Sequence, residues 1–239
     1  MLAFLACEAN KPVRTVFDEY AVEYGQTLEK GISVSGEDQL FFAGARVRWL
    51  QKCLRNYDAE PGLVLDFGCG TGTATPFLLE LHGSQLIGID TSEKSLECAR
   101  TTNNSERSQF ILAGDYQPDG AVDIAFCNGV FHHTPPAERG TSLRFILDSL
   151  RPGGLFSFWE NNPWNPGTRI VMSRIPFDRD AQTLSYLEAK QLLKTAGFQI
   201  LRTDFLFIFP NFLRRLRPLE TLVRRLPLGA QYQILCRKP

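Results

Sequence analysis

The segment VLDFGCGTGTAT places an acid directly before a run of alternating glycines. Gly68, Gly70 and Gly72 form a Gly-x-Gly-x-Gly turn, which lets the backbone approach a ligand closely. Asp66 stands just before them, where it would repel a pyrophosphate but suits a ligand that carries a cationic amine. The last glycine of a nicotinamide fingerprint is replaced by Thr73, and the Gly-Lys-Ser/Thr ending of a phosphate loop is missing. The segment therefore predicts a binding loop for an amine-bearing ligand.

Two histidines and a glutamate are the candidates for proton transfer. His132 and His133 follow a predicted strand, and Glu160 ends the next one. A histidine near its usual pKa of roughly 6.5 is a competent base for a hydroxyl or an amine. The alternatives are a structural role for both histidines at the start of a helix, and for Glu160 a hydrogen bond to its own loop. No third ligand accompanies the histidines, so no metal site is expected.

The elements that must position these residues alternate between strands and helices. Buried apolar runs predict strands, and three- to four-residue apolar spacing predicts helices. The strands are expected at residues 63–68, 85–90, 108–115, 122–128, 152–160, 198–209 and 230–238, and the helices at 73–83, 92–103, 136–150 and 185–197. Two more helices are expected within 13–55, separated by GISVSGE. This order is typical of a doubly wound α/β sheet with helices on both faces. We expect one domain at 59–239, preceded by an N-terminal helical extension at 1–58.

Five segments of the chain together resemble class I S-adenosylmethionine-dependent methyltransferases. LDFGCGTG resembles their first motif, and LIGID, AGDY, NGVFHHTP and LRPGGLFSF resemble later ones in the same order. The resemblance implies a Rossmann-like seven-stranded sheet whose last strand is antiparallel. It implies S-adenosylmethionine as cofactor and S-adenosylhomocysteine as product. The cofactor contacts that it implies are Asp66, Phe67, Gly68, Cys69, Gly70, Gly72, Asp90, Thr91, Asp115, Tyr116, Asn128 and Gly129.

Individual roles follow from the same resemblance. Asp90 would accept hydrogen bonds from the ribose hydroxyls, and Asp66 would lie near the methionine part of the cofactor. Asp115 would point toward the adenine amine, or else cap a turn. Tyr116 would lie beside the adenine ring, or else pack in the protein. Asn128 would line the side of the cofactor that carries the sulfonium, together with Gly129.

The acceptor is expected to lie between the N-terminal extension and the loop WENNPWNPG. In the family, such extensions fold over the cofactor as a lid, which makes Tyr20 a candidate cofactor contact and Tyr24 a candidate acceptor contact. The loop WENNPWNPG resembles the Asn-Pro-Pro-aromatic signature of amine methyltransferases. That signature ends the fourth strand, whereas this loop ends the fifth and lacks one proline, so methylation of nucleobases and protein amides is disfavoured. Asn162 and Trp164 are expected to form a wall of the acceptor pocket.

The overall composition argues against several classes of protein. The chain has 26 basic and 26 acidic residues, so no overall field draws it to nucleic acid. The longest apolar run beyond the N-terminal residues, FLFIFP, is much shorter than the roughly 20 residues that span a bilayer. No transmembrane segment is therefore expected. Six scattered cysteines without a CxxC pair predict neither a zinc ribbon nor a disulfide scaffold, and a reducing cytoplasm is the expected location.

Arginines gather near the end of the chain. Residues 208–229 interleave Leu and Phe with five arginines. This pattern fits a solvated helix face, a helix resting on anionic lipid, or a grip on a phosphorylated or lipid-linked acceptor, with 211–229 as the contact. Pro218 and Pro227 restrict any helix here to short pieces.

The favoured function is methylation of a small molecule or of a lipid- or sugar-linked biosynthetic intermediate. O-methylation is preferred, with N- and C-methylation as alternatives. A non-catalytic S-adenosylmethionine-binding protein is the competing class, and the intact loop and Asp90 argue against it. An aminopropyltransferase would need an acidic polyamine pocket, where this chain offers histidines. The oligomeric state is left open.

Overall fold

A seven-stranded sheet forms the centre of the computed structural model, which describes residues 24–57, 59–178 and 181–239, with side chains from residue 27 onward. The strand order is β3-β2-β1-β4-β5-β7-β6, and β7 is antiparallel to both of its neighbours. The predicted α/β fold with an antiparallel last strand is therefore confirmed. The strands are β1 (Leu63–Phe67), β2 (Gln85–Asp90), β3 (Ser108–Leu112), β4 (Val122–Asn128), β5 (Leu150–Asn161), β6 (Gln199–Leu206) and β7 (Gln231–Arg237).

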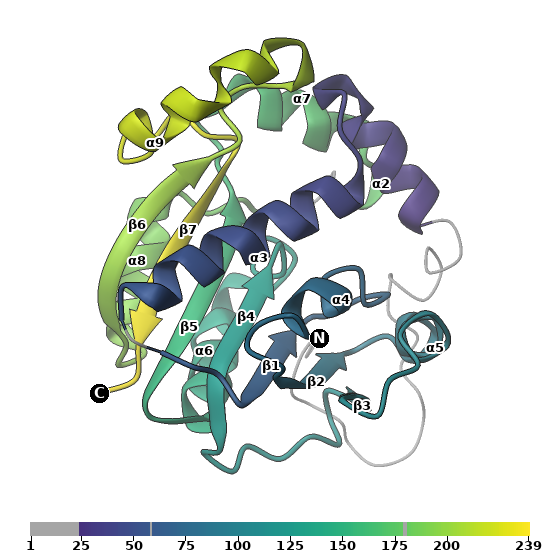
Figure 1. Cartoon of the computed structure of the whole chain (residues 1–239), viewed down its shortest axis with the longest axis vertical. Helices are drawn as coiled ribbons and strands as arrows, with labels where there is room; N and C mark the ends of the chain where they lie inside the picture. Colours follow the sequence, from purple (N-terminus) through teal and green to yellow (C-terminus); the bar gives the residue numbers. More distant parts are fainter. Residues whose placement is uncertain (1–23, 58, 179–180) are drawn as a thin grey trace.

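The helices pack on both faces of the sheet and over its carboxyl edge (Figure 1). Asp38 caps α3 by accepting from the Phe41 amide, and Ser92 caps α5 by accepting from the Ser95 amide. The α-helices are α2 (Tyr24–Ile32), α3 (Gln39–Arg55), α4 (Thr75–Leu78), α5 (Glu93–Thr102), α6 (Pro136–Ser149), α7 (Pro166–Arg174), α8 (Tyr186–Thr195) and α9 (Glu220–Val223). The described residues also contain three 3-10 helices: η1 (Ser33–Ser35), η2 (Pro176–Asp178) and η3 (Asn211–Leu219).

Two local expectations were wrong, and one segment had no predicted element. The helix expected at 73–83 is a single turn, α4, after which the chain reverses at His82 and Gly83, both at positive φ. The third strand ends at Leu112, because the Asp115 amide bonds back to the Leu112 carbonyl and makes a turn. The segment 166–178, for which no element was predicted from the sequence, forms α7 and η2, with Asn165 as the N-cap of α7.

The core has two layers, one on each face of the sheet. Phe156 and Phe158 of β5 point to the layer beneath α6 and α8, whereas Leu155 and Trp159 point to the layer beneath α3, α4 and α5. This alternation is what a strand buried on both faces requires. Each such side chain contributes roughly 1.5–3 kcal/mol when fully buried.

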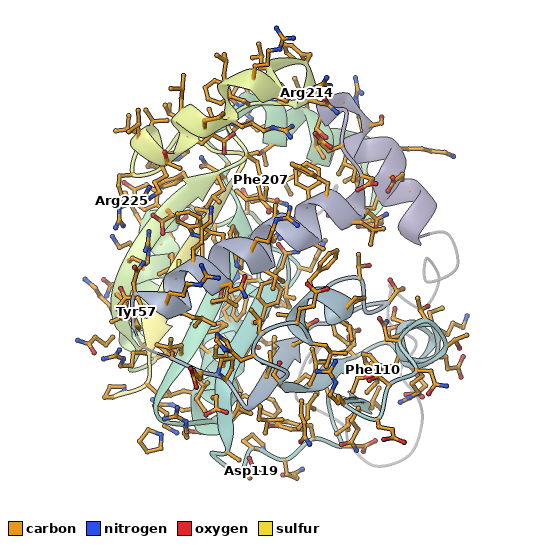
Figure 2. The ribbon with its side chains drawn as sticks, in the orientation of Figure 1. Tyr57, Phe110, Asp119, Phe207, Arg214 and Arg225 are labelled. Carbon is orange, nitrogen blue, oxygen red and sulfur yellow. The ribbon has the colours of Figure 1, made fainter. Side chains whose placement is uncertain are left out.

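The carboxyl edge of the sheet is roofed by segments from both ends of the described chain. In Figure 1, α2, α7 and η3 gather above the ends of the strands. Arg217 of η3 forms an ion pair with Glu37 at 2.7 Å, and Asn211 donates to the Gly36 carbonyl at 2.7 Å. Phe207, labelled in Figure 2, packs edge-on against Phe42 of α3. These contacts join η3 and the chain just before it to the N-terminal part of the described chain.

No helix in the described part of the chain is both long enough and apolar enough to cross a membrane.

Candidate active site

The glycine loop is held in place by the end of β2. The amides of Gly68 and Cys69 donate to the Ile89 carbonyl, and the Gly70 amide donates to Asp90 Oδ2 at 2.8 Å. Asp90 Oδ1 also accepts from the Ser92 amide at 2.9 Å. Asp90 therefore fixes the loop as well as standing where the resemblance places the ribose.

Two glycines of the loop are needed for different reasons. Both Gly68 and Gly70 adopt positive φ, which favours glycine. A Cβ at Gly68 would lie 2.3 Å from a methyl of Val130, so the packing at this position leaves no room for a side chain. A Cβ at Gly70 would meet no atom within 4 Å, so this position opens onto free space. The loop thus presents backbone at Gly70 to a ligand.

Two buried oxygens beside the loop lack a hydrogen-bond donor among the described residues. They are Oδ2 of Asp66 and Oδ1 of Asn128, from the adjacent strands β1 and β4. Burial raises the pKa of Asp66 to about 7, and the nearby charge of Asp90 adds to this shift. Buried acceptors without donors are costly, so the pair is matched by a ligand that brings donors of its own. The α-ammonium of the methionine part of S-adenosylmethionine is such a donor, and these residues therefore fit that cofactor.

The other predicted cofactor residues are placed as follows. Asp115 is exposed past the end of β3, and Thr91 is half-buried at the end of β2. Tyr116 is buried and packs against Phe145 in the core, with the ring centroids 5.7 Å apart. Phe67 is also fully buried, so its side chain serves packing and leaves only its backbone near the loop.

The remaining predicted contacts near the loop lie close to the cavity or outside the described residues. Cys69 and Gly129 both line the cavity, and the Gly129 amide donates to the Trp159 carbonyl. Tyr20 lies outside the described residues. Tyr24 begins α2, and its side chain is likewise not among those described.

The two histidines belong to a chain of four side chains at the ends of β4 and β5. His132 Nδ1 lies 2.7 Å from Glu160 Oε2, and the Phe131 amide donates to Oε1 of the same carboxylate. On the other side, Asp178 Oδ1 lies 3.6 Å from His132 Nε2 and 3.2 Å from His133 Nε2. Sequence reasoning missed Asp178. It ends η2, a segment for which no element was predicted from the sequence.

Within this cluster of four side chains, one histidine is charged and the other is neutral. Burial lowers the pKa of His132, but the carboxylates of Glu160 and Asp178 outweigh it and raise the value to about 10. Burial lowers the pKa of His133, and the charge of its neighbour acts in the same direction. His132 is thus an imidazolium between two carboxylates at neutral pH, and His133 is neutral.

A cavity of about 780 Å³ connects the loop to the histidines. This volume falls within the 300–1,000 Å³ range of small-molecule pockets. Its wall includes residues of the loop, of the β4 end, of the N-terminal helices, of α7 and of the 206–210 segment: Asp66, Gly70, Asn128, His132, His133, Asp178, Leu28, Ile32, Phe41, Phe42, Met172, Ile175 and Phe207. The predicted covering of the site by the N-terminal extension is consistent with this wall.

Three predicted acceptor-side residues are corrected by the structure. Glu160 is fully buried behind His132 and lies outside the cavity wall. Asn162 is fully buried too, and its amide donates to the carbonyls of Pro227 and Gly229. Trp164 is half exposed and packs edge-on against Tyr186, away from the cavity. Glu160 therefore acts through His132, and the other two residues hold the loop to the segment before β7 and to α8.

Comparison with known proteins matches part of the chain to methyltransferases. A family model described as a methyltransferase domain matches residues 64–154. An uncharacterized methyltransferase of Synechocystis, sll0829, is 29% identical over 66% of this chain and 77% of its own length. Trans-aconitate 2-methyltransferase of Rhodopseudomonas palustris strain HaA2 is 26% identical over 68% of this chain, which spans 64% of that relative.

A solved structure gives the same assignment for the fold. It is described as a complex of the Haloferax volcanii Trm112 methyltransferase activator with a methyltransferase, and it superposes with a TM-score of 0.64 at 22% identity. The match covers 95% of this chain and 99% of that one. The family match over residues 64–154, the relatives and the seven-stranded sheet together support a class I methyltransferase domain that uses S-adenosylmethionine.

Proposed function

We propose that the protein transfers the methyl group of S-adenosylmethionine to an oxygen of a small-molecule acceptor. The observation that carries this proposal is one cavity with two chemically distinct ends. One end holds the acceptor oxygens of Asp66 and Asn128, and the other holds His133 and Asp178. The first suits the cofactor, and the second suits an acceptor with an exchangeable proton.

The cofactor supplies a methyl group on an activated sulfonium, and the protein has to align, desolvate and deprotonate the acceptor. Asp66 and the loop backbone would hold the methionine part, and Asp90 the ribose. The N-terminal helices, through Phe41 and Phe42, would exclude water from the cavity. His133 would receive the acceptor proton as the new O–C bond forms and the S–C bond breaks. His132 and Glu160 would position it from behind.

The comparisons support a small acceptor. The relatives named trans-aconitate 2-methyltransferase act, by that name, on a small carboxylate. Three arginines line the cavity, Arg46, Arg174 and Arg217, and Arg217 pairs with Glu37. Arg46 of α3 also lies near the rings of Phe42 and Phe207. An acceptor that carries a carboxylate would pair with Arg46 while it presents an oxygen toward His133.

A lipid-linked acceptor is the second candidate, because the 211–229 segment exposes large apolar side chains. Phe212 and Leu222 there are 81% and 78% exposed. Arg214 and Arg225 belong to the same 211–229 segment and both are exposed, although Arg225 also donates to the Thr203 carbonyl of β6 (Figure 2). An apolar surface flanked by arginines is the pattern of a helix that rests on anionic lipid.

The experiment is a panel assay with methyl-labelled S-adenosylmethionine. Hydroxy and carboxylic acids are offered in solution, and lipid-linked hydroxyl compounds in anionic vesicles. S-adenosylhomocysteine release and the mass and linkage of the product are measured. An O-methyl product from a soluble acid supports the first candidate, and one from vesicles alone supports the second. Labelled N- or C-methyl products would contradict O-methylation, and absence of transfer to every class would favour a non-catalytic binding protein.

A further inference from the structure

We propose that His132, His133 and Asp178 form a binding site for a divalent transition-metal ion at the acceptor end of the cavity. Each residue offers one ligand atom, and all three atoms lie within 4.8 Å of one another. Oδ1 of Asp178 lies 3.6 Å from His132 Nε2 and 3.2 Å from His133 Nε2. Ligands about 2.0–2.1 Å from a tetrahedral ion lie about 3.3 Å from each other, so these separations already match those around such an ion.

The second feature of this site is the carboxylate behind His132. Glu160 bonds His132 Nδ1 at 2.7 Å, which directs Nε2 toward Asp178. An ion that binds Nε2 displaces the proton of the imidazolium, so binding releases that proton to solvent. A carboxylate that accepts from the outer nitrogen of a histidine is the usual support of a metal ligand, because it fixes the tautomer and the ring orientation. Glu160 is itself held by the Phe131 amide. The arrangement thus includes a supporting residue as well as three ligands.

The backbone that carries the ligands is tied together by hydrogen bonds. The Gln182 amide donates to the His132 carbonyl at 2.8 Å. Arg139, which is buried, donates to the carbonyls of Phe131, Thr134 and Gln182. These bonds join the turn after β4 to the chain that follows η2. Little rearrangement is therefore required when an ion binds.

The donor set selects the class of ion. Two imidazoles and one carboxylate suit Zn²⁺, Co²⁺ or Fe²⁺, whereas Mg²⁺ and Ca²⁺ prefer oxygen ligands alone. All three residues line the cavity, so further coordination positions face the space where an acceptor would lie. An acceptor hydroxyl on such an ion loses its proton more readily. With the ion bound His133 is a ligand, so the proton would pass to water instead of to His133. This role rests on the proposed function, but binding of the ion does not.

The competing explanation is an ion-free cluster in which both histidines hydrogen-bond to Asp178. The test is a titration of the chelator-treated full chain with Co²⁺, followed by its visible ligand-field absorption and then by displacement with Zn²⁺. We expect one Co²⁺ per chain, with bands typical of a nitrogen and oxygen site. Asp178→Asn and His133→Gln should each weaken binding by at least about 10–100-fold, and Glu160→Gln by a similar factor through His132.

The matched controls are His82→Gln, which alters the exposed third histidine, and Asp119→Asn, which alters an exposed acid far from the site. Both should bind Co²⁺ as the unchanged chain does. Circular dichroism and thermal unfolding verify that each variant is folded. Absence of the bands in the unchanged chain, or equal affinity in all folded variants, would overturn the site. Co²⁺ binding without methyl transfer would leave the site standing and count against the proposed function. Methyl transfer by a chain that binds no Co²⁺ would overturn the metal site and leave the proposed function standing.

Discussion

The Nδ1 atom of His132 lies 2.7 Å from Oε2 of Glu160, and both side chains are almost completely buried. This pair joins the turn after β4 to the end of β5, directly beneath the acceptor end of the cavity. An unpaired charge left in such a place is much more costly than the pair itself is stabilising. The relationship therefore links the stability of the fold to the geometry of the site.

Glu160→Gln should destabilise the protein by about 3 kcal/mol, because it leaves the imidazolium of His132 with one carboxylate instead of two. Urea unfolding at neutral pH measures this change. Glu80→Gln, in an exposed position after α4, is the matched control and should alter stability by less than about 0.5 kcal/mol. Equal midpoints for the two variants would show that the buried pair carries no net stabilisation.

Asp66 should make the stability of the cofactor-free protein fall as pH rises. Its pKa is about 7 when folded, against about 4 when unfolded, so the folded state binds more protons between these values. The stabilisation is complete below about pH 4 and is lost as pH rises through 7. Urea unfolding at pH 5 and pH 8 should show this trend in the unchanged chain. Asp66→Asn should flatten it, whereas Asp148→Asn, at an exposed site on α6, should not.

Cofactor binding should depend on pH in the opposite direction. The ammonium of the methionine part pairs with the ionised carboxylate of Asp66, which is mostly protonated below pH 7 in the free protein. Affinity should therefore fall by up to about tenfold per unit as pH drops below 7. Calorimetry in two buffers of different ionisation heat should detect proton release on binding at pH 6. Constant affinity between pH 6 and 8 would separate Asp66 from the cofactor.

Asn162 and Trp164 should differ in what their loss affects. Asn162→Ala removes two donated hydrogen bonds and one accepted from the Trp164 amide, which should cost about 2–3 kcal/mol. Trp164→Ala removes a half-exposed ring from Tyr186 and should cost less than about 1.5 kcal/mol. Thermal unfolding ranks the two variants. A large rise in the acceptor KM of the Trp164 variant would restore its predicted place in the pocket wall.

Bound S-adenosylhomocysteine should protect the N-terminal helices from proteolysis. Leu28 and Ile32 of α2 line the cavity, so a ligand there should reduce local opening of this helix. Trypsin cleavage after Lys30, in α2, should slow several-fold when the ligand is present. Cleavage after Arg55, at the far end of α3, provides the internal control and should be unchanged. Equal slowing at both bonds would indicate general stabilisation and not a lid.

The sequence predicted what neighbouring residues determine and missed what the fold brings together. Asp66 lies one residue before the end of β1 and Asp90 ends β2, so their place at the carboxyl edge followed from strand prediction alone. Asp178 reaches the histidines only because α7 and η2 turn back over the edge of the sheet. The N-cap Asn165 before Pro166 was the available signal for that helix. Trp164 shows the other limit, because a position just beyond a strand does not fix the direction of its side chain.

The most direct test of the account is a calorimetric titration of the full chain with S-adenosylhomocysteine, compared between Gly70→Ala and Gly83→Ala. Both glycines adopt positive φ and have open space at the Cβ position, so both variants should lose about 1 kcal/mol of stability. Gly70 lies in the glycine loop, and Gly83 lies in the turn before β2. The account predicts one bound ligand per chain, affinity reduced at least tenfold in Gly70→Ala, and affinity unchanged in Gly83→Ala. No binding to the unchanged chain, or equal affinity in both variants, would contradict it.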